Sequence, residues 1–305
     1  MSTAATNRPS PANRPGAQGD SHERARATAY RPSTARRVQS WIGDRIVMAF
    51  ALLVLVYLFV PVAYTFVFSF NNYRRSNIAW NPEGSPTLKH WQHPCAAPGV
   101  CESLKTSIEV GAIATVVATV LGTMLAFALV RHRFRGKGAA NMLVFVPMAT
   151  PEIVLGASLL TIFVQGFSRV GLRLGFWTIV IAHIMFCLSF VVVTVRARLQ
   201  SLDPRLEEAA QDLYAGPGST FWRVTLPLVL PGIVGAALLA FSLSFDDFII
   251  TNFVSGDVTT FPKFVYVSYL RGIPAQANVI GFSMFVIALL LVIAGTVIGR
   301  ARSKT

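Results

Sequence analysis

The sequence predicts an all-α integral membrane protein with six transmembrane helices. Of the 305 residues, 53% are hydrophobic and only 13% are charged, which is too apolar a composition for a soluble chain of this length. The apolar residues lie in long blocks, and a helix of about 20 residues is enough to cross roughly 30 Å of hydrocarbon. The six blocks lie at about residues 45–70, 108–130, 140–165, 175–195, 229–253 and 277–299.

The segment before the first block, residues 1–40, is basic and contains Pro and Ser. This composition is typical of a solvated, disordered arm, with a specific anionic-lipid site as the alternative. The first apolar run begins only near Ile46 and has no small-residue cleavage site after it, so we expect it to stay as an anchor. Because no internal repeat follows, residues 41–305 are predicted to form a single six-helix transmembrane domain.

The basic residues predict the orientation of the chain. If the N-terminus is cytoplasmic, the inner segments hold 19 of the 27 Lys and Arg residues and the outer segments hold eight. This asymmetry follows the positive-inside rule and predicts that both termini and the loop at residues 196–228 are cytoplasmic. It also explains the net charge of +13 without a nucleic-acid partner.

The first outer loop, residues 71–107, is polar and rich in Pro, and it contains Cys95 and Cys101. On the oxidising side of a membrane we expect a disulfide between these two residues, with two free thiols as the alternative. His90 and His93 lie nearby, but their spacing to the cysteines is not a familiar one for zinc, so no metal site is predicted.

Three acidic residues lie inside apolar blocks: Glu152 in the third, and Asp246 and Asp247 in the fifth. An ionisable side chain within a membrane costs about 2.5–3.5 kcal/mol and usually marks a pathway or a pairing site. Because no Lys or Arg lies at a comparable depth, a cationic substrate would supply the missing charge. The alternative is that the acids are protonated or hydrogen-bonded to Ser, Thr and backbone groups. His183, in the fourth block, is read as a hydrogen-bonded packing residue rather than a ligand.

The loop at residues 196–228 predicts a short amphipathic helix. Asp203 can cap its N-terminus and Pro204 suits its first turn, while Gly216 to Gly218 end it. Its apolar positions repeat at helical spacing, at Leu206, Ala209, Ala210 and Leu213. A helix of this kind in an otherwise apolar chain predicts contact with a soluble partner, and an ordinary connecting helix is the alternative.

This loop resembles the EAA loop of ABC-importer permease subunits, because Glu208-Ala209-Ala210 and Leu226-Pro227 fall at the family's separation. The resemblance implies that Glu208 enters a groove of an ATPase subunit, with Ala209 and Ala210 allowing close approach. The implied coupling residues are Glu208, Ala209, Ala210, Leu213, Tyr214, Arg223, Leu226 and Pro227. Tyr214 stands where the family usually has Gly. If that turn is left-handed, a non-Gly residue there costs about 1–2 kcal/mol unless Gly216 takes over the turn.

Further motifs look like those of the spermidine/putrescine permease subunits. They read PMATPEIVLGASLL at 147–160, GFWT at 175–178, IAHI at 181–184, FSLSFDDF at 241–248 and FVSG at 253–256. The likeness covers about residues 45–300 and implies a type I ABC importer permease fold with a cytoplasmic coupling helix. It also implies a polyamine substrate, which would pass the pathway acids Glu152, Asp246 and Asp247.

The resemblance further implies three kinds of partner: a second homologous permease, two cytoplasmic ATPase subunits and an extracytoplasmic binding protein. The Gly136-Lys137 pair lacks the surrounding residues of a phosphate-binding loop, so ATP is expected on a separate chain and no cofactor on this one. No catalytic constellation is present in the sequence. The alternatives are import of iron, thiamine, a sugar or an anion, or a channel or secondary transporter that needs no ATPase.

Overall fold

The computed structural model describes residues 34–73, 77–167, 171 and 173–302, and every regular element among them is a helix. The chain divides into two compact units, Met1–Ala63 and Tyr64–Thr305. Most of the tail predicted at residues 1–40 lies outside the described residues, and the single domain of residues 41–305 stays a prediction.

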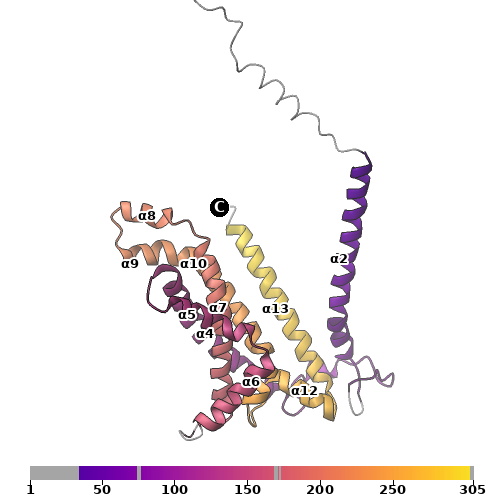
Figure 1. Cartoon of the computed structure of the whole chain (residues 1–305). Coiled ribbons are helices and arrows are strands. Elements are labelled where there is room, and N and C mark those ends of the chain that lie inside the picture. The colour runs from indigo at the N-terminus through magenta and orange to yellow at the C-terminus, as the bar shows by residue number, and fades with distance from the viewer. Residues whose placement is uncertain (1–33, 74–76, 168–170, 172, 303–305) are drawn as a thin grey trace, which may run out of the picture. The chain divides into compact units, whose positions relative to one another are not determined.

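One long helix, α2 (Thr34–Phe68), makes up the described part of the first unit and ends within the second (Figure 1). Its apolar part, Arg45–Phe68, is long enough to cross a membrane and matches the first predicted block. Thr34 to Asp44 extend this helix on its N-terminal side, into the segment for which the sequence predicts a disordered arm.

The second unit contains the other helices. They are α3 (Lys89–Gln92), α4 (Val100–Arg131), α5 (Lys137–Ala149), α6 (Glu152–Thr161), η1 (Ile162–Phe167), α7 (Phe176–Gln200), α8 (Arg205–Asp212), α9 (Pro217–Thr220), η3 (Phe221–Thr225), α10 (Leu226–Asp246), α11 (Ile249–Val254), α12 (Phe261–Arg271) and α13 (Ala275–Arg302). Two of these, η1 and η3, are π-helical turns.

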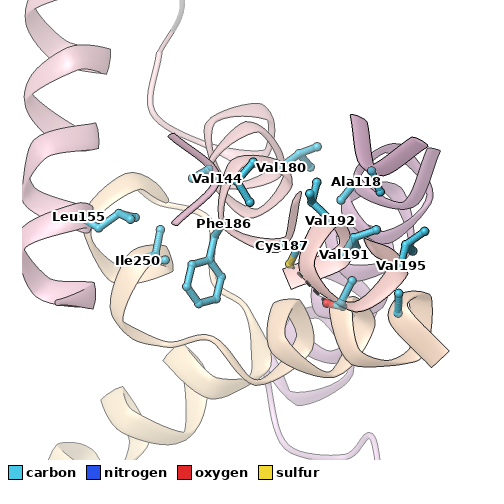
Figure 2. Packing of buried hydrophobic residues seen from close by; sticks show 14 of the residues in the cluster. Ala118, Val144, Leu155, Val180, Phe186, Cys187, Val191, Val192, Val195 and Ile250 are labelled. Carbon is cyan, nitrogen blue, oxygen red and sulfur yellow. Dashed lines mark hydrogen bonds between the residues drawn. The ribbon is translucent and has the colours of Figure 1, made fainter. Parts of the chain in front are cut away.

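The core of the second unit forms around α7, which packs against α4, α5, α10 and α11. Of the most apolar stretch of α7, 61% is buried, against 28% in α4, so α7 is the central helix. The face of α4 toward α7 carries small residues; Figure 2 shows Ala118 beside Val191 and Val192. At Gly122, a Cβ atom would lie only 2.7 Å from a methyl group of Val191. Small residues let helices approach closely in a membrane, where van der Waals packing replaces the hydrophobic effect.

Within the described ranges of the chain, five helical stretches are long and apolar enough to cross a membrane, and the third predicted block is a bent pair. Its halves, α5 and α6, meet at 107°. The third predicted span is therefore made of two helices that meet at a sharp bend, and with this pair taken as one span the described residues contain six. Pro151 explains the bend, because a proline disfavours helical backbone in the residue before it, and Thr150 is extended with φ −81° and ψ 131°.

The fifth predicted block is also divided differently from the expectation. Helical structure runs from Pro217 to Asp246, so it starts earlier than predicted and ends earlier. Asp247 is extended, with ψ 122°, and the remaining residues of the block form the separate helix α11. The π-helical turn η3 comes just before Pro227, where the missing N–H removes one helical hydrogen bond.

The first outer loop is shorter than predicted, because α4 begins at Val100 and contains Cys101 in its first turn. A buried amide network organises this loop. The Asn71 side chain donates to Asn77 Oδ1 at 2.6 Å and to the Ala79 carbonyl at 2.9 Å, and its own Oδ1 accepts from the Asn81 N–H at 2.8 Å. These bonds satisfy polar groups that burial would otherwise leave without water.

Candidate functional site

The loop between α7 and α10 folds as the sequence predicts, around the short helix α8. Asp203 Oδ1 accepts the backbone N–H of Arg205 at 3.0 Å, and Pro204 stands directly before the helix. The following segment, α9 and η3, leads without interruption into α10. The chain therefore joins α8 to the end of α7 and, through α9 and η3, to the start of α10, and α7 and α10 pack against each other.

The helix α8 presents an exposed surface that includes apolar side chains. No residue of α8 is buried, Leu213 is 82% exposed and Tyr214 is 98% exposed. Glu208 and Ala209 are exposed, and Ala210 is half-buried. Exposed apolar side chains gathered on a protein surface mark interaction sites. These five residues of the predicted coupling set lie on one short segment that is open to a partner.

The remaining predicted coupling residues, Arg223, Leu226 and Pro227, lie across η3 and the start of α10. Arg223 and Pro227 are exposed and Leu226 is half-buried. Trp222 is 67% exposed in the same segment. The exposed surface therefore continues beyond α8 onto η3.

A left-handed turn ends α8, and Tyr214 itself adopts it, with φ +61°. Its N–H donates to the Gln211 carbonyl at 2.9 Å, and the N–H of Ala215 donates to the Ala210 carbonyl at 3.1 Å. These two bonds form a Schellman motif, in which glycine is the usual residue at the left-handed position. Gly216 has φ −67° and does not take over the turn.

Replacing Tyr214 with Gly should raise the free energy of unfolding by about 1 kcal/mol, because the left-handed backbone is strained for a residue with a Cβ. Thermal unfolding of the purified protein in detergent measures this change. The matched control is Leu213→Gly, since Leu213 is also highly exposed but has φ −84° and gains nothing from glycine. A lower unfolding midpoint in Tyr214→Gly would contradict the strained turn.

The inner side of α8 contacts the rest of the second unit through Glu207, which the sequence analysis did not select. Glu207 Oε1 accepts hydrogen bonds from Arg131, at the end of α4, and from Thr225 Oγ1 at 2.8 Å. A cavity of about 590 Å³ lies beside this network, between the C-terminal part of α4 and the α8–η3 segment. The sequence signal for Arg131 was its position at the end of an apolar block.

The three acids of the predicted pathway do not share one environment. Glu152 is the first residue of α6, directly after the 107° bend, and it is exposed. The positive end of the helix dipole favours a carboxylate there. Asp246 is the last residue of α10 and is exposed, whereas the Asp247 side chain is only 4% exposed.

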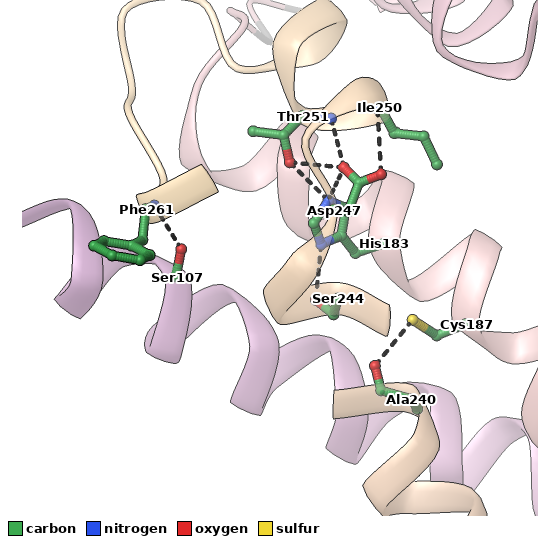
Figure 3. Close-up of polar contacts among 9 residues, drawn as sticks. All are labelled: Ser107, His183, Cys187, Ala240, Ser244, Asp247, Ile250, Thr251 and Phe261. Atoms are coloured by element: carbon green, nitrogen blue, oxygen red, sulfur yellow. Dashed lines mark hydrogen bonds and ion pairs between the residues drawn. The ribbon is translucent and has the colours of Figure 1, made fainter. Parts of the chain in front are cut away.

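The Asp247 carboxylate belongs to a buried polar cluster with His183 (Figure 3). His183 Nε2 lies 3.2 Å from Asp247 Oδ2 and 3.0 Å from Thr251 Oγ1, while its Nδ1 lies 2.7 Å from Ser244 Oγ. Asp247 also accepts the N–H groups of Ile250 and Thr251, at 3.3 and 2.8 Å. The cluster fastens α7 to the break between α10 and α11, which is a packing role for His183.

The two cysteines of the first outer loop form a disulfide, with Cα atoms 5.3 Å apart. Cys187, in α7, is free and buried. His90 is buried, and this burial lowers the pKa of its imidazole, so the side chain is neutral at pH 7. His93, in contrast, is exposed.

A family model described as "Binding-protein-dependent transport system inner membrane component" matches residues 118–302. The chain is 34% identical over 264 residues to the spermidine/putrescine transport system permease protein PotC of Escherichia coli strain K12, covering 86% of this chain and 97% of that protein. It is 35% identical over 233 residues to the putrescine transport system permease protein PotI of the same strain, covering 74% and 81%.

The fold is similar to that of a chain in a solved bacterial alginate ABC transporter in complex with an alginate pentasaccharide-bound periplasmic protein. The TM-score is 0.61 at 17% sequence identity, over 84% of this chain and 92% of that chain. At this identity the likeness concerns the fold alone. The fold is that of the type I ABC importer permeases.

Proposed function

Since the chain belongs to the family of binding-protein-dependent transport system inner membrane components, we propose that it is the permease subunit of an ATP-driven polyamine importer. The observation that carries this proposal is the 34% identity, over 86% of the chain, to a relative named as a spermidine/putrescine permease. The chain is a transport protein of the membrane and forms half of a translocation pathway.

The importer would be completed by other chains. A second homologous permease forms the other half of the pathway, two ATPase subunits bind the cytoplasmic side, and a binding protein delivers cargo from outside. Two observations support this assembly: the sequence has no phosphate-binding loop of its own, and α8 with η3 exposes a surface suited to a soluble partner. In this arrangement both termini and α8 are cytoplasmic, as the distribution of Lys and Arg predicts.

The coupling mechanism follows from the connectivity of α8. ATP-driven closure of the ATPase pair moves α8 as a rigid segment, with Glu208 in the ATPase groove and Ala209 allowing close approach. Because α8 is joined at either end to α7 and α10, its displacement shifts these two helices together. Such rigid-body motion converts the pathway between inward-facing and outward-facing states.

For a polyamine cargo, the acids Glu152, Asp246 and Asp247 have different roles. Glu152 and Asp246, whose carboxylates are exposed in this chain, supply negative potential for a cationic cargo. Asp247 instead accepts hydrogen bonds inside the protein and holds α11 in place. A polyamine is a multivalent cation, so unpaired carboxylates at breaks in two membrane segments suit it.

Removing the charges of Glu152 and Asp246 together, as Glu152→Gln with Asp246→Asn, should therefore reduce polyamine uptake. A hydrogen bond to a charged group contributes about 1.5–3 kcal/mol, so we expect a loss of about tenfold or more. Uptake is measured in vesicles that contain the assembled importer. The control Glu102→Gln removes an exposed charge from the first turn of α4 and should not change uptake. Normal polyamine uptake in the double variant would remove both acids from cargo selection.

The proposed function is tested by the ATPase activity of the complete reconstituted importer. We expect cargo-loaded binding protein to stimulate ATP hydrolysis with spermidine or putrescine, and not with iron, thiamine, a sugar or an anion. Stimulation by one of these other solutes, with none by either polyamine, would assign a different cargo within the same family. An absence of any associated ATPase would instead favour a channel or secondary transporter.

A further inference from the structure

An ion pair connects the end of α4 to the inner side of α8. Arg131 is the last residue of α4 and Glu207 lies in the first turn of α8, 76 positions further along the chain. The two side chains are 32% and 22% exposed. Thr225 of η3, which is buried, donates to the same Glu207 oxygen at 2.8 Å. The Glu207 carboxylate thus connects α8 to both α4 and η3.

Apart from this ion pair, α8 has few contacts with the long helices of the second unit. No residue of α8 is buried, and its most extensive contacts with other helices are those with α9 and η3. A cavity of about 590 Å³ lies between the α8–η3 segment and the C-terminal part of α4, with Met124 and Phe127 among its lining residues. Phe127 also contacts Phe221 of η3, with ring centroids 5.4 Å apart, so η3 has apolar packing against α4. The helix α8 itself reaches α4 through the Arg131–Glu207 pair.

Arg131 lies at the end of a helix that is firmly packed in the core, so its bond to Glu207 connects α8 to that core. The helix α4 packs along α7 and α10, with small buried residues on the shared face, so its end is firmly placed in the core. Charge-assisted hydrogen bonds between guanidinium and carboxylate groups are directional and about twice as strong as neutral ones. The Arg131–Glu207 bond links α8 directly to the end of α4, so a displacement of α8 acts there without passing through α7 or α10.

We propose that the Arg131–Glu207 pair transmits the movement of α8 to α4 and thereby couples ATP hydrolysis to transport. Glu207 and Arg131 are positioning residues in this role, and Glu207 projects from α8 about 100° around the helix axis from the exposed Glu208. The proposal rests on the proposed function, because it assigns a second route for the movement that the ATPase imposes on α8. Through it, α4 follows α8 together with α7 and α10.

The test is a charge swap in the complete importer, reconstituted with its partner permease, ATPase and binding protein. Arg131→Glu and Glu207→Arg should each reduce spermidine uptake per ATP hydrolysed by about tenfold, within the usual range of coupling between sites. The double variant, Arg131→Glu with Glu207→Arg, restores opposite charges and should recover most of the loss. Hydrogen exchange of the α8 amides should rise in each single variant and fall again in the double variant.

A second ion pair on the same helix provides the matched control. Lys105 and Glu109 lie on α4 with their charged atoms 3.8 Å apart, and their side chains are 77% and 49% exposed. Reversing either of these charges should change neither uptake nor the exchange of α8. A purely structural role for Arg131 would lower the amount of assembled complex, whereas the proposed role changes the ratio of transport to hydrolysis.

Two results would overturn the proposal: single reversals that leave both the coupling ratio and α8 exchange unchanged, or a double variant no better than the worse single variant. The exchange measurement needs no cargo, so it separates this proposal from the proposed function. If the wild-type importer transports no spermidine but the exchange of α8 follows the charge swap, the cargo assignment fails and the connection between α8 and α4 stands.

Discussion

Replacing Glu208 with Lys is expected to abolish cargo uptake while leaving the permease in the membrane. The Glu208 side chain is exposed on α8, so the substitution removes no internal packing, and exposed substitutions usually change stability by less than about 0.5 kcal/mol. It does reverse the charge at the proposed ATPase contact. Uptake by vesicles, the amount of permease in the membrane and the ATPase recovered with it are the three measurements.

The matched control for Glu208→Lys is Asp212→Lys. Asp212 is also an exposed acid on α8, but it lies outside the Glu-Ala-Ala motif. The same change of charge there should leave uptake near the wild-type value. Wild-type uptake in Glu208→Lys would remove this residue from the coupling mechanism.

Replacing Asp247 with Ala should greatly reduce the amount of folded protein. Its carboxylate is buried and accepts hydrogen bonds from the Ile250 and Thr251 N–H groups, and it faces His183. A buried hydrogen-bonding group left without its partner typically costs about 1–3 kcal/mol, and this substitution leaves several such groups without partners. The readouts are the yield of protein from the membrane and its unfolding midpoint in detergent.

The neighbouring substitution Asp246→Ala separates this structural effect from a cargo effect. Asp246 is exposed, so its replacement should leave yield and unfolding midpoint unchanged. An Asp247→Ala protein that is as stable as wild type would contradict the role of the His183 cluster. A loss of folded protein in Asp247→Ala, with normal yield in Asp246→Ala, would show that Asp247 stabilises the fold and that Asp246 does not.

The membrane segments were largely predictable because their apolar length alone identifies them, but their breaks were not. Hydrophobicity continues through Pro151 and through Asp247, so the blocks look unbroken in the sequence. The backbone nonetheless turns by 107° at the first and leaves the helix at the second. Pro151 was a usable signal for the first break, since the residue before a proline is biased toward extended backbone. At the second break, Asp247 bonds to Thr251, which is four residues away, and lies 3.2 Å from His183, which only the tertiary fold brings there from 64 positions away.

In the loop at residues 196–228, the sequence likewise predicted some features and not others. The motif and the helical spacing predicted α8, and the non-Gly residue in the motif suggested the left-handed turn that Tyr214 adopts. They did not distinguish the role of Glu207 from that of Glu208. The two side chains project about 100° apart on any helix, but which of them faces the rest of the protein depends on how the helix packs. The partner of Glu207, Arg131, lies 76 residues away, and no local pattern connects the two.

The most direct test of the central claim is ATP-dependent accumulation of spermidine by proteoliposomes that contain the complete importer and its binding protein. We expect accumulation against a concentration gradient with ATP on the ATPase side, and none when ATP is replaced by a non-hydrolysable analogue. Unlabelled putrescine should compete, and an unrelated sugar should not. Spermidine that only equilibrates across the membrane, or that enters equally without ATP, would contradict the assignment of this chain to an ATP-driven polyamine importer.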